Sequence, residues 1–145
     1  MASGQTVTGR NFNKIAQYTT ASQISHASQT KVTLVTLSLG PGNWLVTYNT
    51  PLNSHAFATY GRSYVGLYAD GTLLTGSVQA CRSDDSEQEN IEHSLGASII
   101  YRNNKSSDVS MTVETYVESG TTSFSAINTP VANNYPTIAA VRLYF

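Results

Sequence analysis

Histidines and carboxylates are the side chains of this chain that could hold a metal ion. The three histidines, His26, His55 and His93, lie far apart and form no His-x-His or His-x-x-x-His pair, the spacings that suit zinc. More than half of the acidic residues fall within residues 82–92, but this stretch lacks the glycine and the fixed ligand spacing of a calcium loop. The sequence therefore predicts a solvated acidic loop, with a charged partner contact as the alternative, and no metal or other cofactor.

Carboxylates and nucleophile motifs give no sign of an enzyme. Glu114 and Glu118 share one side of a single strand-like stretch, whereas a glycosidase needs two carboxylates that face each other across the substrate. No Gly-x-Ser-x-Gly elbow, P-loop or dinucleotide fingerprint occurs. Asn104-Lys105-Ser106 matches a glycosylation sequon, but no secretory signal accompanies it, so we interpret the match as accidental. We expect a protein that is not an enzyme.

Tyrosines are the residues whose chemistry suits recognition, because each ring pairs an apolar face with a polar hydroxyl. The chain holds nine tyrosines and one tryptophan, a content that suits sugar-stacking surfaces or protein interfaces. We expect core and interface packing for most of them. A ligand or partner contact is an equal alternative for tyrosines near turns or on the outward side of a strand. With the acidic stretch included, the candidate partner-contact residues are Tyr101, Tyr116, Tyr135, Asp84, Asp85 and Glu87.

Composition narrows the class of protein. Charged residues make up 12% of the sequence and the net charge is −1, so the chain has no basic field to attract nucleic acid. Such a weakly charged, hydroxyl-rich composition is common in β-rich extracellular or virion proteins. The single cysteine, Cys81, excludes an intrachain disulfide. With no secretory signal and no long apolar run, we expect a soluble protein made in a cytoplasm, without membrane insertion.

The first clear strand-like stretches in the sequence are two that follow each other closely. Residues 31–48 predict a hairpin around the Gly-Pro-Gly-Asn turn of residues 40–43, where proline presets φ and the glycine and asparagine after it tolerate positive φ. Inside the first strand the apolar phase changes between Leu34 and Val35. This change indicates a β-bulge or a strand that is buried on both faces.

Further strands follow at short intervals. Residues 63–78 predict a second hairpin around the tight turn of Asp70-Gly71, and residues 109–117 alternate apolar and polar side chains as a half-buried strand does. Residues 137–145 form a terminal strand. A series of short strands without a convincing helix predicts an all-β, antiparallel β-sandwich jelly roll or barrel in a single domain.

The terminal strand is apolar on both of its sides, so we expect both faces to be covered, one of them by another subunit. This expectation makes the protein an oligomer. The predicted interface residues are Ile138, Ala140, Val141, Leu143, Tyr144 and Phe145.

Residues 1–30 are polar and lack a helical stripe. We predict an extended arm before a domain of residues 31–145, with a half-ordered leader as the alternative. The arm would dock through its apolar residues, Phe12, Ile15, Tyr18 and Ile24.

Two segments carry a resemblance to a known family. Residues 37–46, LSLGPGNWLV, resemble the first hairpin of the tumour-necrosis-factor-like and complement-type globular head domains, in the versions found in bacteriophage and bacterial appendage proteins. Residues 135–143, YPTIAAVRL, are similar to the terminal strand of that group. The resemblance implies a ten-stranded jelly roll that assembles as a homotrimer with its terminal strand near the threefold axis, whereas the sequence pattern indicates eight strands or more. The long polar arm and the acidic stretch of residues 82–92 depart from the family pattern.

These features predict a bacteriophage virion structural protein. It would be a homotrimeric decoration or knob protein that the arm attaches to a capsid or tail, so its partners are its own copies and another virion protein. The alternative is the receptor-binding head of a tail fibre or spike, whose loops at residues 52–60 and 82–92 bind a host-surface glycan. A cytokine-like or complement-like ligand is a third reading, which the missing secretory signal disfavours.

Overall fold

A computed structural model of the chain describes residues 5–7, 12–18, 23–26, 31–55, 61–83, 90–119, 122–125, 127–128, 133–134 and 136–144, with side chains for 31–51, 63–80, 94–116, 118 and 136–144. These ranges contain strands and turns but no helix, which confirms the all-β prediction for them. The strands are β1 (Gln5–Val7), β2 (Phe12–Tyr18), β3 (Gln23–His26), β4 (Lys31–Leu39), β5 (Gly42–His55), β6 (Gly61–Ala69), β7 (Thr72–Leu73), β8 (Gln79–Ser83), β9 (Asn90–Asn103), β10 (Val109–Ser119), β11 (Thr122–Ser125), β12 (Ile127–Asn128), β13 (Asn133–Asn134) and β14 (Thr137–Leu143).

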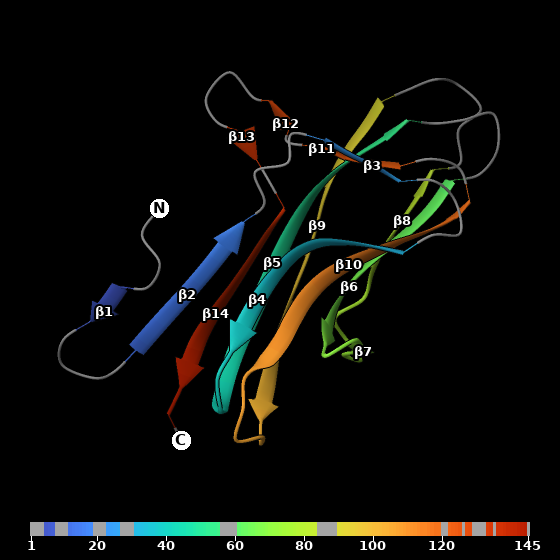
Figure 1. The fold of residues 1–145 in the computed structure, drawn as a ribbon. Helices are drawn as coiled ribbons and strands as arrows, with labels where there is room; N and C mark the ends of the chain where they lie inside the picture. The colour runs from blue at the N-terminus through green and yellow to red at the C-terminus, as the bar shows by residue number, and fades with distance from the viewer. Residues whose placement is uncertain are drawn as a thin grey trace.

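Two antiparallel sheets make up the body of the fold (Figure 1). Sheet A runs in the order β1-β2-β14-β5-β11-β3, with β9 also paired to β5. Sheet B runs in the order β4-β10-β6-β7, with β8 also paired to β6. A small separate sheet joins β12 and β13. Because the two large sheets share one core, the arrangement is compatible with a β-sandwich.

Strand pairing is nested along the chain. β2 pairs with β14, β4 with β10, β5 with β9 and β6 with β8. The first half of the chain therefore runs beside the second half in reverse order, and both halves pass back and forth between the sheets. As a result, strands that follow each other in sequence, such as β4 and β5 or β9 and β10, lie in different sheets.

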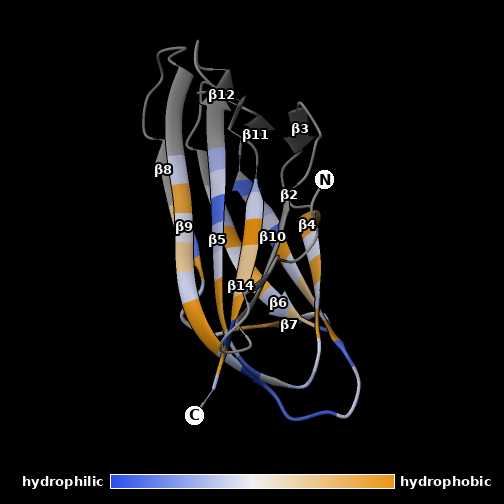
Figure 2. Cartoon of the chain, turned by 90° about the vertical axis from the view of Figure 1, so that its left-hand side faces the viewer, coloured by the Kyte–Doolittle hydropathy of each residue, from blue (hydrophilic) through white to orange (hydrophobic). Residues whose placement is uncertain are grey.

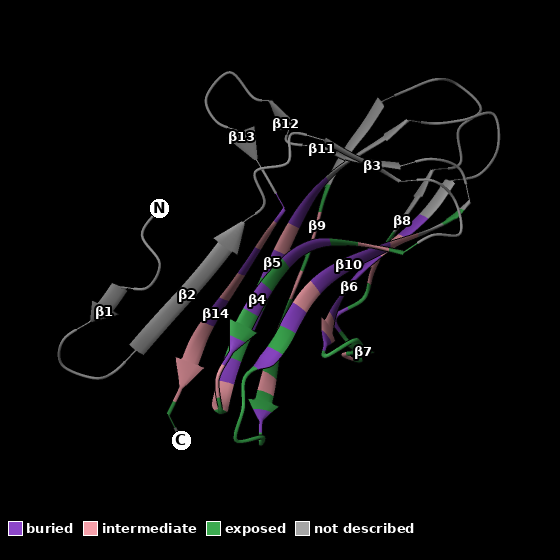
Figure 3. Cartoon of the chain, in the orientation of Figure 1, coloured by how far each residue is buried: buried purple, intermediate pink, exposed green. Residues whose placement is uncertain are grey.

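The core lies between the sheets, where alternate residues of each strand meet. Sheet A contributes Trp44, Val46 and Tyr48 from β5, with Ile138 and Ala140 from β14. Sheet B contributes Leu34, Val35, Leu37, Leu39, Val65, Leu67, Ala69, Val109, Met111 and Val113. Figure 3 shows the alternation of buried and exposed positions along β4 and β10. Since side chains alternate across a strand, each sheet also has an outer face.

The hairpin predicted for residues 31–48 is wrong. β4 pairs with β10 in sheet B, whereas β5 pairs with β14 and β9 in sheet A, so residues 40–41 carry the chain from one sheet to the other. Gly42, with a φ of 134°, begins β5, and Trp44 Nε1 donates a hydrogen bond to the Gly40 carbonyl oxygen at 2.9 Å. Two strands in facing sheets bury one side each, as two strands of a hairpin do, so the same alternation fits both arrangements.

The β-bulge in β4 is confirmed. Val113 of β10 pairs with Val35, but the next residue, Glu114, pairs with Thr33, which leaves Leu34 as the extra residue. Leu34 and Val35 are both buried although they are neighbours. The bulge turns the side chain of the extra residue into the core and explains the change of phase.

The Asp70-Gly71 turn and the regular strand after it are also confirmed. Asp70 and Gly71 have φ angles of 46° and 80°, the pair of positive values that a type I′ turn requires, and they connect β6 to β7. β7 is only two residues long, and the chain returns to pair with β6 again as β8. In β10 the alternation predicted for residues 109–117 buries Val109, Met111 and Val113.

The predicted arm contributes strands to sheet A. β2 pairs with β14, with Ile15 opposite Ala140 and Tyr18 opposite Thr137, and β3 pairs with β11, with Ile24 opposite Phe124. Phe12 is the first residue of β2. The described backbone of β1, β2 and β3 is therefore extended and pairs within sheet A. The division of the chain into an arm and a domain stays a prediction. The side chains of these docking candidates lie outside the described ones, and docking through them stays a prediction.

Candidate functional site

A pocket of about 250 Å³ lies on the outer face of sheet B. Its walls combine three tyrosines, three aliphatic residues, a glycine and one carboxylate. These residues come from β6, β7, β10 and the segment before β8, and they are Tyr64, Tyr68, Tyr116, Val65, Leu73, Val78, Gly66 and Glu114. Such a mixture of apolar surface and a few polar groups is typical of small-molecule sites.

Strand register brings the pocket residues together. Across β10 and β6, Tyr116 pairs with Tyr64 and Glu114 pairs with Gly66. These residues alternate with the core residues of β6, so they stand on the outer face. The pairing places two aromatic rings next to a position without a side chain, which leaves a hollow between them.

Gly66 keeps the floor of the pocket open. A Cβ atom at this position would lie 3.1 Å from Leu73 Cδ1 and 3.5 Å from Val78 Cγ2. Leu73 reaches this place because it pairs with Tyr68 across β7 and β6, and 43% of its surface is exposed. A larger residue at Gly66 would fill the space that the pocket now offers.

Glu114 is a nearly buried carboxylate, with 7% of its surface exposed. Its Oε1 accepts a hydrogen bond from Thr112 Oγ1 at 2.8 Å, and its Oε2 forms an ion pair with Lys31 Nζ at 2.5 Å. Lys31 Nζ also lies 4.5 Å from the centroid of the Tyr68 ring, a cation–π distance. The hydrogen bond to Glu114 raises the pKa of Lys31. The carboxylate of the pocket is therefore neutralised by a lysine of the neighbouring strand.

Hydrogen bonds to the core anchor the segment that carries Val78. Ser77 Oγ accepts from the Leu67 N–H at 2.9 Å and donates to the Leu74 carbonyl oxygen at 2.7 Å. The Tyr48 hydroxyl, which reaches across from sheet A, donates to the Ser77 carbonyl oxygen at 2.7 Å. Burial raises the pKa of Tyr48 to about 12, so this hydroxyl remains a donor at neutral pH. Hydrogen bonds from the core side therefore hold the segment that forms this wall of the pocket.

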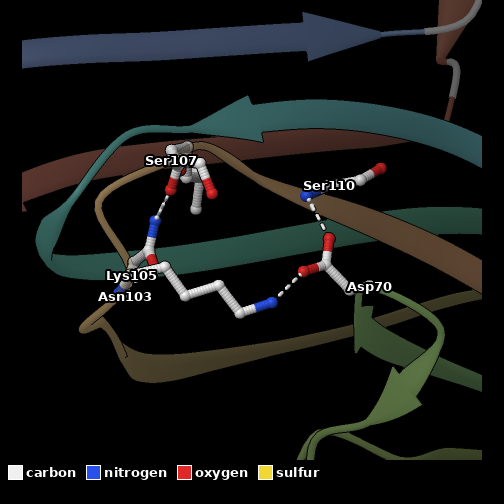
Figure 4. A network of polar contacts seen from close by, with 6 residues as sticks. Asp70, Asn103, Lys105, Ser107 and Ser110 are labelled. Carbon is white, nitrogen blue, oxygen red and sulfur yellow. Dashed lines mark hydrogen bonds and ion pairs between the residues drawn. The ribbon is translucent and has the colours of Figure 1, made fainter.

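The β6–β7 turn is held from its other side by the turn between β9 and β10 (Figure 4). Asp70 Oδ1 accepts from the Ser110 N–H at 2.8 Å, and Asp70 Oδ2 contacts Lys105 Nζ at 2.5 Å. The Lys105 ammonium, and after it the Ser110 N–H, lowers the pKa of Asp70. Asn103 closes its own turn by donating to the Ser107 carbonyl oxygen at 2.9 Å.

The predicted partner-contact residues meet different outcomes. Tyr116 lies in the pocket wall, whereas Tyr101 is half-buried and packs against the hydrophobic core. The remaining candidates lie outside the described residues; they are Tyr135, Asp84, Asp85 and Glu87. Partner contact through any of the six residues stays a prediction.

Sequence reasoning missed the centre of the pocket. Tyr64 and Tyr68 fall among the tyrosines expected to pack in the core or an interface, but both line the pocket. The sequence does hold one sign of the pocket, which is Gly66 midway between the two tyrosines. Residues two apart in a strand share a face, so the three positions lie on one face and the glycine leaves a gap between the two rings.

The predicted interface residues divide between the two faces of β14. Ile138 and Ala140 have no exposed surface and belong to the core of the single chain. Val141 and Leu143 are half-buried on the outer face, and Tyr144 has 52% of its surface exposed. Phe145 lies outside the described residues. Subunit contact stays a prediction, and among the described candidates only the last three have accessible surface for it.

An apolar row crosses the outer face of sheet A. Val141 of β14 pairs with Leu45 of β5, and Leu45 pairs with Ile100 of β9. Leu45 has 37% and Ile100 has 63% of its surface exposed. Figure 2 shows these three strands side by side, each with hydrophobic stretches. Contiguous exposed apolar side chains of this kind often mark an interaction surface.

Few charged residues surround this row, although Lys14 of β2 pairs with Val141 at one end of it. Among the described side chains of β5, β9 and β14 that point outward, Arg102 is the one that is charged. The neighbouring outward positions are uncharged, as with Thr47 and Ser98, whose hydroxyl oxygens lie 2.8 Å apart. Depletion of charge around an apolar centre is a feature of interface cores.

Two further features concern the described residues only. Their strands and turns include no helix that is long and apolar enough to cross a membrane. The described residues also include no group of three or more His, Cys, Asp or Glu side chains that could hold a metal ion.

Comparisons with known proteins find a likeness in fold. No protein family model and no curated protein sequence matches the chain. A chain in the structure of the infectious bursal disease virus Gx strain matches with a TM-score of 0.50 and 13% identity, over 92% of this chain and 38% of that chain. The VP2 subviral particle of the same virus gives a TM-score of 0.47 and 15% identity, over 90% of this chain and 37% of that chain. This chain thus spans well under half the length of the structures it matches, and what it shares with the first of them is an all-β fold.

Proposed function

We propose that the chain is a structural protein of a virion, a homotrimeric jelly roll that decorates a bacteriophage capsid or tail. The observation that carries the proposal is the apolar row of Val141, Leu45 and Ile100 on the outer face of sheet A. The likeness in fold to a chain of a virus structure supports the viral setting. No catalytic role is part of this proposal.

Nested strand pairing supports the jelly-roll assignment. A jelly roll consists of eight main strands in two antiparallel sheets with Greek-key connections. Here the eight strands that form the nested pairs divide evenly, with β2, β14, β5 and β9 in sheet A and β4, β10, β6 and β8 in sheet B. In this assignment β1 adds an outer strand next to β2, and β3 and β11 extend one end of sheet A.

The apolar row supports contact between copies of the chain. A row that crosses three strands of one sheet offers a continuous surface, and a second copy presents an identical one. Tyr144, at the end of β14, adds an aromatic ring with more than half of its surface exposed. The half-buried Val141 and Leu143 would complete their burial in the trimer.

Attachment to the particle is proposed to use the N-terminal arm. β1 stands at the end of the strand order in sheet A, and its outer edge pairs with no other strand among the described residues. A free edge can receive a strand of another protein by β-augmentation. Because β2 already pairs with β14, deletion of residues 1–10 removes β1 and keeps the pairing of β2. We expect this deletion to weaken particle binding while the trimer remains, because it removes the β1 edge and keeps the docking candidates from Phe12 onward.

Particle association is the direct test of the virion role. Antibodies against the purified chain are expected to label particles from the same source on electron-microscopy grids, and the neighbouring genes are expected to encode capsid or tail proteins. Unlabelled particles, with neighbouring genes unrelated to virions, would contradict the proposal.

A receptor-binding head is the second candidate function. The observation that favours it is the tyrosine-lined pocket, because a decoration protein needs no small-molecule site. The two functions are compatible, since the pocket lies on the outer face of sheet B and the apolar row on the outer face of sheet A.

A further inference from the structure

We propose that the pocket on sheet B binds one neutral saccharide ring, between the rings of Tyr64, Tyr68 and Tyr116 and over Gly66. Neither the likeness to virus structures nor the proposed trimer assigns this site. The pocket is formed by described residues of one chain, so the proposal stands independently of the oligomeric state.

The apolar part of the lining selects a ligand with an apolar face. Three tyrosine rings surround a floor without a side chain, and Leu73 and Val78 form the remaining wall. Pyranose rings carry a patch of C–H groups that packs on aromatic rings, which present an apolar body and a polar hydroxyl. A volume of about 250 Å³ lies just below the roughly 300–1,000 Å³ of pockets for drug-sized ligands, so it suits one ring rather than a long chain.

The polar part of the lining selects a ligand with hydroxyl groups. Glu114 is the charged residue of the lining, and its carboxylate accepts hydrogen bonds; its ion-pair partner Lys31 is not among the lining residues. Sugar hydroxyls can donate to this acceptor. A purely apolar ligand would bury the carboxylate without replacing its hydrogen bonds to water, which is unfavourable.

Charge pairing selects against ionic ligands. The Glu114 carboxylate and the Lys31 ammonium lie 2.5 Å apart and cancel each other. A cationic ligand would have to displace Lys31, which already lies over the Tyr68 ring, and an anionic ligand would meet the carboxylate of Glu114. A neutral polar ring avoids both penalties.

Saturation-transfer NMR with the full-length protein tests the proposal. The probes are methyl glycosides of glucose, galactose, mannose, N-acetylglucosamine and rhamnose at millimolar concentration, with choline chloride as the cationic probe. We expect at least one glycoside to give a signal and choline to give none. In the ¹⁵N-labelled wild-type protein, the same glycoside is expected to shift the amide resonances of residues 64–68 and 114–116 and to leave those of β14 in place.

Substitutions at Tyr116 separate stacking from general effects. Tyr116→Ala removes a ring from the wall and is expected to weaken glycoside binding about tenfold or more, whereas the matched control Tyr116→Phe keeps the ring and is expected to bind like the wild type. Thr36→Ala, on the same outer face but outside the pocket, is a second control.

Three results would overturn the proposal. They are a glycoside panel without any signal, choline binding in place of glycoside binding, and glycoside shifts that map away from residues 64–68 and 114–116. The shift map uses the wild-type protein, so it decides the question even if Tyr116→Ala fails to fold. None of these results bears on the mass of the assembly, so the proposed trimer is judged separately.

Discussion

The Tyr48 hydroxyl crosses the core from sheet A and donates a hydrogen bond to the Ser77 carbonyl oxygen at 2.7 Å, on the sheet B side of the molecule. A second carbonyl oxygen, that of Val65, lies 3.2 Å from the same hydroxyl. Tyr48 is 1% exposed, so water does not substitute for it. One buried side chain thus joins the two sheets and supports the segment that forms one wall of the pocket.

Tyr48→Phe is expected to destabilise the fold by about 1–3 kcal/mol, because it removes the donor and leaves a buried carbonyl oxygen without it. Urea unfolding at neutral pH measures the change. An unfolding free energy equal to that of the wild type would show that the hydroxyl is not needed.

Tyr48 also predicts a dependence on alkaline pH. Burial raises its pKa from 10.0 to about 12, so its contribution is complete below pH 10 and declines as pH rises toward 12, where the unfolded chain releases the proton first. Tyr48→Phe is expected to remove this part of the decline, which amounts to about 2 kcal/mol. Parallel unfolding curves of wild type and variant across that range measure it, and an identical pH dependence of the two would contradict the assignment.

Gly96 is expected to reject any side chain, although it is exposed on β9. A Cβ atom there would lie 2.7 Å from the Tyr48 carbonyl oxygen, which belongs to the paired strand and cannot rotate away. Gly96→Ala is expected to lower the unfolding free energy by about 1–3 kcal/mol. The matched control is Gly40→Ala, whose Cβ would lie at an ordinary 3.5 Å from Asp108 Oδ1. Equal stability of the two variants in urea unfolding would contradict the prediction.

Asp70→Asn is expected to lower stability at neutral pH and to have less effect in acid. Lys105 lowers the pKa of Asp70, so the contribution of the carboxylate is present above its ordinary pKa and is lost as pH falls through the lowered value. Asparagine tolerates the positive φ of 46° and still accepts from the Ser110 N–H, so the variant removes the charge alone. Chemical unfolding at neutral pH and in strong acid measures both effects. A difference between wild type and variant that stays constant across this range would argue against the ion pair.

Local patterns of the sequence predicted local structure well. The phase change at Leu34 and Val35 identified the bulge, and Asp70-Gly71 identified the turn, because each feature depends on residues close in sequence. The partners of the strands could not be found in this way. Trp44 and Leu37 are both buried, and each would be buried on the same side of its strand in either of two arrangements. The two strands could pair with each other in one sheet, or they could face each other across a core, and the alternation of side chains does not distinguish these arrangements.

The candidate site was predicted less well for the same reason. Tyr116 was a candidate because it stands on the outward side of a regular strand, but its partners Tyr64 and Glu114 depend on the register between β10 and β6. Ile138 and Ala140 were assigned to an interface because the terminal strand is apolar on both sides. The structure distinguishes those two core residues from Val141, which faces outward.

Ile100→Lys is expected to dissociate the proposed trimer. A lysine at the β9 end of the apolar row would bury an unpaired charge in each subunit contact, which costs several kcal/mol per contact. Thr36→Lys introduces the same charge at an exposed position on the opposite sheet and is expected to leave the assembly intact. Sedimentation velocity compares the two variants, and equal masses for them would place the contact elsewhere.

The mass of the wild-type protein in solution tests the central claim most directly. Multi-angle light scattering during gel filtration at micromolar concentration is expected to give three times the 15.6 kDa mass of the chain, unchanged on moderate dilution. A single species of 15.6 kDa would contradict the trimer and the structural role built on it.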